Sequence, residues 1–337
     1  MMDKCFDISA CDCLIDLHLH LDGSLSLESV KELARLEGVE LDLSDGEILS
    51  RLTVSDDCRD LNEYLEKFDF PLTLLQSSKT IERAFYNLGC ELKTSGLMYA
   101  EIRFAPQLHK KKGLSGDMIV KAALRGLKAS GLPSNIIICM MRGENNREEN
   151  LESVRLAKKY LGYGVCAIDL AGAEGLYKNE LFCEEISLAR SLGIPVTLHA
   201  GEASGHESVM SALSMGACRI GHGVRSYKSD ETMALLREKG TLLELCPTSN
   251  LNTSVFERLG DYPIRTFMEH GVRISVNTDN MSVSATDIKK EWQRLINTFS
   301  LKDAEIHKIL SDTLSGSFAS DEDKRRMQEK IDLCFQV

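Results

Sequence analysis

Eight short runs of apolar, often β-branched residues alternate with longer segments of helical period along this chain. Such alternation is typical of parallel β/α units, in which each strand is followed by a helix. The expected strands are Cys13–His18, Leu97–Phe104, Asn135–Met141, Val165–Leu170, Pro195–His199, Arg219–His222, Thr241–Leu245 and Arg273–Thr278. Eight strands of this kind predict a fold of the α/β class, a (β/α)8 TIM barrel.

Helices are expected between the later strands, and several of them end at a glycine. The expected helices are Gly116–Ala129, Glu148–Leu161, Lys178–Leu192, Glu207–Met215, Ser229–Lys239 and Pro263–His270. The glycines that precede the next strand are Gly131, Gly193, Gly216, Gly240 and Gly271. Glycine adopts the left-handed conformation that ends a helix and turns the chain back toward the sheet.

The segment between the first and second strands is much longer than the other connections. Three helices are expected within it, Ser26–Glu37, Asp60–Leu75 and Thr80–Thr94. An insertion at this position of a barrel lies over the carboxyl ends of the strands, where active sites form. Three further helices are expected at the C-terminus, Ala285–Phe299, Lys302–Leu314 and Asp321–Phe335. We therefore predict one domain over residues 1–337, with residues 26–95 as a helical insertion over the active-site face.

Composition excludes several classes of function. A net charge of −11 disfavours binding to nucleic acid phosphates or to anionic lipid. No apolar run is long enough to span a membrane, and the first residues do not resemble a signal peptide. The 11 cysteines are odd in number, are scattered and include no Cys-x-x-Cys pair, so we expect free thiols, a cytoplasmic location and no thiolate zinc site.

Residues able to bind a metal or transfer a proton gather at the ends of the expected strands. His18 and His20 are two apart on one strand, so their side chains point the same way and can bind one ion. A lone His-x-His is equally compatible with a polar strand end beside a turn. The other strand ends carry Arg103, Arg142, Asp169 with Gly172, His199 with Glu202, His222, and Asp279 with Asn280.

Three imidazoles and one carboxylate suit a divalent ion of the zinc type with one position left for water. The candidate ligands are His18, His20, His199 and Asp279. Glu202 is available as a proton donor and His222 as a base or orienting group. Taken singly, Glu202 also fits a carboxylate at a helix start, and Asp279 fits an Asp-Asn turn. The remaining histidines, His109, His206, His270 and His307, are expected to contact solvent or to pack.

Six segments together resemble one known family. They are His18-Leu-His-Leu-Asp-Gly-Ser24, Asp169-Leu-Ala-Gly-Ala-Glu-Gly175, His199-Ala-Gly-Glu202, Gly221-His-Gly223, Cys246-Pro-Thr-Ser-Asn250 and Asn277-Thr-Asp-Asn280. In this order the chain resembles the adenosine deaminase family of zinc amidohydrolase barrels. The resemblance extends over residues 18 to 280, and the remaining helices fit the size of the family.

The resemblance implies hydrolytic deamination of adenosine and 2′-deoxyadenosine to inosine and deoxyinosine, with release of ammonia, in purine salvage. It implies one zinc ion per chain, bound by His18, His20, His199 and Asp279. Glu202 would protonate N1 of the purine, and water activated by the metal and oriented by His222 and Asp279 would add to C6.

The resemblance also implies the contacts to the substrate. The backbone N–H of Gly172 would meet N3, and Asp22 with His20 would meet the ribose hydroxyls. Asn280 departs from the family, since many members carry a second aspartate that faces N7. An amide can still donate to N7 through its NH2 group.

Alternative functions remain at this stage. Adenine deaminases of the family tend to carry Glu in the position of Asp22, and the shorter side chain leaves room for ribose. A nucleotide deaminase would need basic residues to meet the phosphate. Deamination of another 6-aminopurine nucleoside stays open, as does, from a different class, a catalytically inactive purine-binding barrel. The expected partner is a small purine nucleoside, with no nucleic acid or membrane; protein partners stay unknown.

Overall fold

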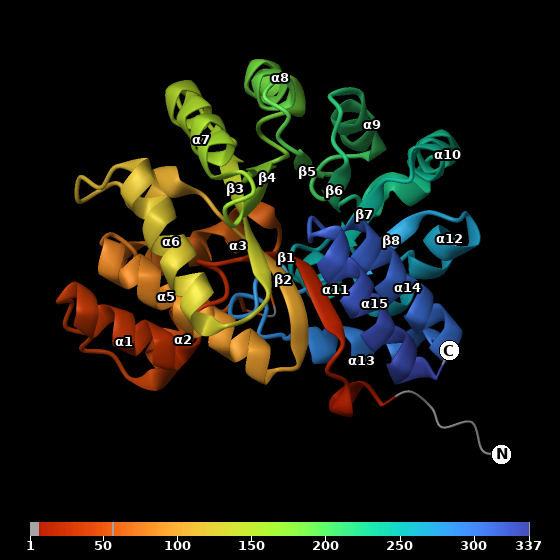
Figure 1. Cartoon of the computed structure of the whole chain (residues 1–337), viewed down its shortest axis with the longest axis horizontal. Helices are drawn as coiled ribbons and strands as arrows, with labels where there is room; N and C mark the ends of the chain where they lie inside the picture. The colour runs from red at the N-terminus through yellow and green to blue at the C-terminus, as the bar shows by residue number, and fades with distance from the viewer. Residues whose placement is uncertain (1–6, 56, 337) are drawn as a thin grey trace.

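Eight parallel strands form a closed ring in the computed structural model, which describes residues 7–55 and 57–336 (Figure 1). The strands are β1 (Leu14–His20), β2 (Leu97–Phe104), β3 (Ser134–Met141), β4 (Val165–Ala171), β5 (Thr197–Ala200), β6 (Arg219–His222), β7 (Leu242–Leu245) and β8 (Arg273–Val276). They pair in sequence order as two sheets of four, β1 to β4 and β5 to β8. The predicted α/β class and strand order are confirmed.

Two short junctions join the sheets into a barrel. Between β4 and β5, Ile168 bridges Val196. Between β1 and the residues after β8, Leu19 bridges Asp279; the N–H of His20 donates to the Asp279 carbonyl at 2.8 Å, and the N–H of Asp279 donates to the His18 carbonyl at 2.8 Å. The second junction therefore brings the His-x-His strand and Asp279 together through the backbone.

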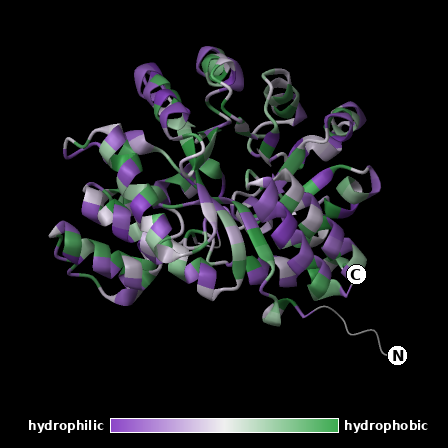
Figure 2. Ribbon diagram, in the orientation of Figure 1, coloured by the Kyte–Doolittle hydropathy of each residue, from purple (hydrophilic) through white to green (hydrophobic). Residues whose placement is uncertain are grey.

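Helices surround the ring, and most of the outer ones carry both hydrophobic and hydrophilic residues (Figure 2). They are α6 (Gly116–Ser130), α7 (Arg147–Tyr160), α8 (Cys183–Ser191), α9 (His206–Ser214), α10 (Asp230–Lys239), α11 (Pro247–Asn252), α12 (Ile264–Glu269), α13 (Ile288–Phe299), α14 (Asp303–Gly316) and α15 (Asp321–Phe335). Short 3-10 helices complete the set: η1 (Ile8–Ala10), η2 (Glu66–Phe68), η3 (Pro106–His109), η4 (Asn179–Phe182), η5 (Val224–Lys228) and η6 (Leu259–Asp261). The five glycines predicted to precede strands all have positive φ, between 63° and 87°.

The segment between β1 and β2 is helical, as predicted, but its helices differ in detail. It contains α1 (Leu27–Glu37), α2 (Asp45–Leu52), α3 (Leu61–Leu65), α4 (Asp69–Thr73) and α5 (Ser78–Thr94). The predicted helix Asp60–Leu75 was wrong: it is divided into α3, η2 and α4, because Pro71 has no N–H for the helical bond one turn earlier. Helix α2 was missed, although Ser44 and Glu47 form the capping box that marks its start.

Two other predicted helices differ at their starts. The segment predicted as Lys178–Leu192 begins as η4 and becomes α8 only at Cys183. The helix predicted from Ala285 begins at Ile288, where the Asp287 side chain accepts from the N–H of Lys290.

Two further features concern the cysteines and the helices of the described residues. All its cysteines are free thiols. Across the described residues, no helix combines the length and the apolar character that crossing a membrane requires. The single domain predicted for residues 1–337 stays a prediction; its ends, residues 1–6 and 337, lie outside the described residues.

Candidate active site and metal centre

A cavity of about 270 Å³ lies between the carboxyl ends of the strands and the helices of the β1–β2 segment. From the strand ends it is lined by His20, Asp22, Arg142, Gly172, His199, Glu202, His222, Asp279 and Asn280. From the helical segment it is lined by Leu61, Tyr64, Leu65, Phe68, Asp69 and Leu72. The strand ends also contribute apolar residues, among them Phe104, Ala105 and Met141, so most of the titratable groups lie on one side of a largely apolar cavity. This side is its floor, and the helical segment forms its cover.

Four donor groups converge on one point of this floor. The Nε2 atoms of His18 and His20 lie 3.4 and 3.5 Å from Oδ1 of Asp279, and Nε2 of His20 lies 3.3 Å from Nε2 of His199. The four donor atoms all lie within 4.8 Å of one another. Nε2 of His18 is buried and has no hydrogen-bond partner. A buried donor without a partner, beside two further imidazoles and a carboxylate, fits a bound divalent ion.

The imidazoles of His18 and His199 are oriented by carboxylates behind them. Nδ1 of His18 lies 2.7 Å from Oε2 of Glu244, and Nδ1 of His199 lies 2.8 Å from Oδ2 of Asp169. A carboxylate that accepts from Nδ1–H leaves the Nε2 lone pair free for a metal. Glu244 was missed by the sequence reasoning, although it is the single charged residue of an otherwise apolar strand, β7.

Glu202 is buried across the cavity floor, with Oε2 lying 3.5 Å from Nε2 of His222. Burial raises the pKa of its carboxyl well above the usual value, and the charges of Asp279 and Glu174 raise it further. Both effects favour the protonated, neutral form of the carboxyl.

The backbone around Glu202 is held from both sides. The carboxylate of Glu174 accepts from the backbone N–H groups of residues 201 to 204, at 2.7 to 3.0 Å. Nε of Arg225 donates to the Glu202 carbonyl at 2.7 Å. Glu174 lies within a segment that carries the family resemblance, but the sequence did not indicate this role.

The protonation state of His222 follows from its neighbours. The amide oxygen of Asn250 accepts from the Tyr262 hydroxyl at 3.0 Å, so the amide NH2 faces Nδ1 of His222, at 3.1 Å. Nδ1 therefore accepts, and Nε2 carries the proton. Burial lowers the pKa of this imidazole well below its usual value, so the ring is neutral. The Nε2–H group lies 3.9 Å from Oδ2 of Asp279, beside the donor set.

His222 and Asp279 share an uncommon backbone conformation. Both have a φ of 59°, in the left-handed region that residues other than glycine rarely adopt. His222 is the last residue of β6, and Asp279 follows β8 by three residues. The chain turns sharply at both places, and both side chains line the cavity.

Comparison with known proteins decides the family. A family model described as adenosine deaminase matches residues 13–334. The chain belongs to the adenosine deaminase family. The adenosine deaminase of Haemophilus ducreyi is 48% identical over 328 residues, which cover 94% of this chain and 95% of that protein.

Two solved structures share the fold of this adenosine deaminase family member. The adenine deaminase of Arthrobacter aurescens is 21% identical, with a TM-score of 0.87 over 97% of this chain and 100% of that one. An amidohydrolase from Burkholderia ambifaria, solved with bound zinc, is 20% identical, with a TM-score of 0.86 over 98% of this chain and 93% of that one. At these identities the likeness concerns the fold alone.

The structure brings the predicted site residues of this adenosine deaminase family member together. All of them line the cavity except His18, which lies beneath its floor and directs Nε2 toward Asp279. Asp22 is buried, which raises the pKa of its carboxyl to about 6. Asn280 lies against Gly23: a Cβ on that glycine would come within 1.9 Å of the amide oxygen. Tyr64 and Phe68 of the cover were not predicted as site residues. The spacing of apolar residues indicated a helix there but not which of its side chains face the cavity.

Proposed function

We propose that this enzyme is a zinc-dependent hydrolase that converts adenosine and 2′-deoxyadenosine to inosine and deoxyinosine, with release of ammonia, in purine salvage. The observation that carries the proposal is the convergence of His18, His20, His199 and Asp279 beside the buried carboxyl of Glu202 in one cavity. The 48% identity to an adenosine deaminase supports the choice of substrate.

We infer that His18, His20, His199 and Asp279 would hold the zinc ion, one per chain. Bound there, the ion would supply a water of lowered pKa as nucleophile. The imidazoles meet the requirement for such a site, because their Nε2 atoms face one another while carboxylates occupy Nδ1 of His18 and His199.

The chain's own groups then move the protons. Glu202, protonated at neutral pH, donates to N1 of the purine and makes C6 electrophilic. His222 donates through Nε2–H to the attacking oxygen, because Nδ1 is occupied by the Asn250 amide. Asp279 takes up the proton that this oxygen loses as it adds to C6 and passes it to the amino nitrogen, so the C6–N bond breaks and ammonia leaves. The second proton of the water returns to Glu202 as the C6 carbonyl forms. Two acids of opposite protonation, Glu202 and Asp279, thus divide the proton transfers, since their environments shift the two pKa values in opposite directions.

Substrate contacts follow from the lining of the cavity. We propose that the N–H of Gly172 donates to N3, that Asp22 and His20 bind the ribose hydroxyls, and that the Asn280 amide donates to N7. The apolar side chains of residues 61 to 72 would exclude water above the purine.

The cavity disfavours a phosphorylated substrate. Among the described residues that line it, Arg142 is the only arginine or lysine. Both terminal nitrogens of its guanidinium already donate to the protein, Nη1 to the Tyr177 carbonyl and Nη2 to Asn179 and to the His199 carbonyl, while Nε is buried and has no partner. Asp22 and Asp69 add negative charge to the same cavity. A phosphate would therefore meet two carboxylates and a single guanidinium whose terminal nitrogens are already used by the protein.

Parallel turnover of four compounds tests the proposal: adenosine, 2′-deoxyadenosine, adenine and adenosine monophosphate, each followed by ammonia release. We expect the two nucleosides to be deaminated and the nucleotide to be a poor substrate. Faster turnover of adenine than of adenosine would instead favour an adenine deaminase and would contradict the assignment of Asp22 to ribose. The absence of turnover with all four compounds would favour the inactive purine-binding barrel.

A further inference from the structure

One guanidinium inside the barrel joins the carboxylates that orient two of the candidate metal ligands. Arg103 projects from β2, and its side chain is completely buried. Nη1 donates to Oδ2 of Asp169 on β4 at 2.9 Å, and Nη2 donates to Oε2 of Glu244 on β7 at 2.7 Å. Nη2 also donates to the Leu17 carbonyl on β1, at 2.7 Å. Arg103 therefore crosses the barrel interior between strands that are distant in the sequence.

The carboxylate oxygens that Arg103 binds are the ones that bind the histidines. Oδ2 of Asp169 lies 2.8 Å from Nδ1 of His199, and Oε2 of Glu244 lies 2.7 Å from Nδ1 of His18. Nδ1 of His18 is hydrogen-bonded to Glu244, whereas Nδ1 of His199 lies at ion-pair distance from Asp169 outside hydrogen-bond geometry. A carboxylate held by the guanidinium can only accept, so its position beside Nδ1 favours a proton on that nitrogen. Each Nε2 is then left with its lone pair directed at the candidate metal site.

We infer that Arg103 is a positioning residue for the metal centre: it fixes the tautomer and orientation of His18 and His199 together, through one guanidinium that contacts neither the metal nor the substrate. The inference rests on the proposed metal site. To hold both carboxylates, the side chain at position 103 needs two donor nitrogens at a fixed spacing. A guanidinium has them and an ammonium does not. Arg103→Lys keeps the charge, but its single nitrogen cannot hold both carboxylates in this geometry.

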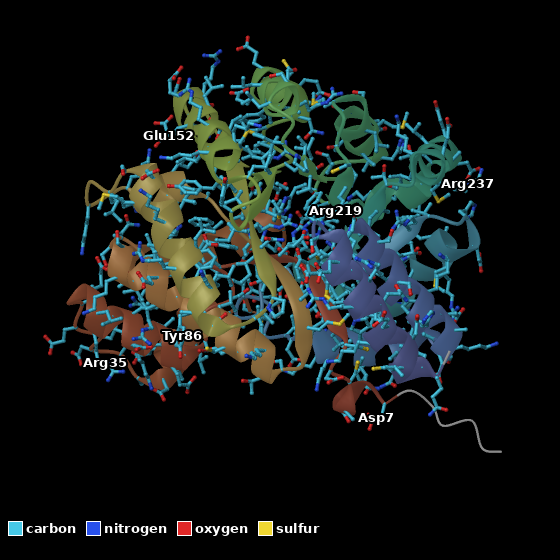
Figure 3. All side chains as sticks on the ribbon, viewed as in Figure 1. Asp7, Arg35, Tyr86, Glu152, Arg219 and Arg237 are labelled. Atoms are coloured by element: carbon cyan, nitrogen blue, oxygen red, sulfur yellow. The ribbon has the colours of Figure 1, made fainter. Side chains whose placement is uncertain are left out.

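Arg219 offers a matched control within the same core (Figure 3). It is as buried as Arg103, and its Nε donates to Oε1 of Glu244 at 2.7 Å. Its other carboxylate partner is Glu101, at 2.6 Å, so it does not reach the Asp169–His199 pair. Arg219→Lys therefore disturbs the same buried network while leaving the orientation of His199 intact.

The test compares the affinity of the native protein, Arg103→Lys and Arg219→Lys for zinc, by competition with a chromophoric chelator. We expect Arg103→Lys to bind zinc ~10–100-fold more weakly, the range for residues that orient metal ligands, and Arg219→Lys to lose less than ~10-fold. Native affinity in Arg103→Lys, or an equal loss in both variants, would overturn the inference while leaving the proposed function intact. A native protein that binds no zinc would contradict the proposed function and with it this inference.

A second measurement begins with the native protein and so tests part of the inference without any variant. Nitrogen-15 spectra of the native full-length chain, freed of metal, report the tautomer of each histidine. We expect His18 and His199 both to carry the proton on Nδ1, and we expect Arg103→Lys to give a mixture of tautomers at both positions. An Nε2–H tautomer at either histidine of the native protein would overturn the inference, as would unchanged spectra in a folded variant.

Discussion

At the scale of single residues, the proposed site contains two kinds of groups. Some would contact the substrate, and others determine the protonation of those groups. Glu202 lies in the cavity, but its protonation depends on burial and on Asp279 and Glu174. Glu202→Gln keeps the shape of the side chain but cannot deliver a proton to N1. We expect turnover to fall by at least ~10²-fold while zinc content and the binding of a purine ground-state analogue persist. Near-native turnover of this variant would show that another group protonates the ring.

Asn280 provides a second residue-level prediction. Its amide oxygen is buried without a hydrogen-bond partner, which is consistent with an NH2 group turned toward the cavity. A 7-deaza analogue lacks the N7 acceptor and leaves that donor unpaired, at a cost of ~1–3 kcal/mol, roughly 5- to 150-fold in affinity. Competition binding of adenosine and its 7-deaza analogue measures the difference, and Asn280→Ala should remove most of it. Equal affinities in the native protein would exclude a contact between Asn280 and N7.

The sequence predicted the residues at the strand ends but not the groups that orient them. His18, His199 and Asp279 follow apolar runs, and their position on parallel strands is enough to place them at one edge of a barrel. Glu244 and Glu174 have roles that depend on partners from other strands and loops, His18 and the N–H groups of residues 201 to 204. Hydrogen bonds between residues far apart in the sequence leave no recognisable motif around either residue, so they are seen only in the structure.

At the scale of elements, the cover of the cavity is attached to the loop that follows β8. The Tyr64 hydroxyl of α3 lies 2.7 Å from the Ser284 hydroxyl. The Thr53 hydroxyl donates to the Ser282 carbonyl at 2.8 Å, and the N–H of Val54 donates to the Val283 carbonyl at 3.0 Å. The same loop begins beside Asp279 and Asn280. Its hydrogen bonds therefore connect the cover to the part of the cavity that contains the candidate metal ligand Asp279.

Tyr64→Phe removes one of these attachments without removing the ring. We expect the affinity for a purine nucleoside analogue to fall by the worth of one hydrogen bond, ~0.5–1.5 kcal/mol or roughly 2- to 13-fold. Ser284→Ala should cost a similar amount, and the double variant should lose little more than either single one. Losses that simply add in the double variant would mean that the two hydroxyls do not interact.

The base of the cover contains a buried histidine. Nδ1 of His109 lies 2.9 Å from the Leu75 carbonyl, and burial lowers the pKa of the ring from its usual 6.5 to about 4. A folded-state pKa below the unfolded one means that stability is lost as pH falls from about 6.5 to about 4. The loss attributable to His109 reaches ~3 kcal/mol at most. Urea unfolding at pH 7 and pH 4.5 measures it, with His109→Asn as the control that can still donate to Leu75. The same decline in both proteins would assign it to other groups.

Periodicity predicted the outer helices of the barrel better than those of the cover. Helices α6 and α15 coincide closely with the predicted ranges, because each is long and begins after a serine whose side chain caps its first turn. The cover is made of short helices, and Pro71 removes one helical hydrogen bond from this segment. Helices this short contain too few turns for the spacing of apolar residues to predict where each begins and ends. The junctions that close the ring could not be predicted, since Leu19 and Asp279 are far apart in the sequence and pair only through the fold.

At the scale of the whole molecule, the ring of strands assembles one site from both ends of the sequence. The candidate metal ligands come from β1, from β5 and from the residues after β8, and the junction between β1 and Asp279 closes the barrel at the same place. An ion held by these residues would therefore lie at the junction that closes the barrel. The cytoplasmic location predicted from the sequence stays a prediction, as do protein partners and oligomeric state.

The most direct test of the account is ammonia release from adenosine by the native protein, by the protein stripped of metal with a chelator, and by the stripped protein after zinc is restored. The account predicts turnover in the native protein, its loss on stripping, and its recovery once one zinc ion per chain is bound, because the nucleophilic water depends on the ion. Stripped protein that deaminates adenosine at the native rate would contradict it.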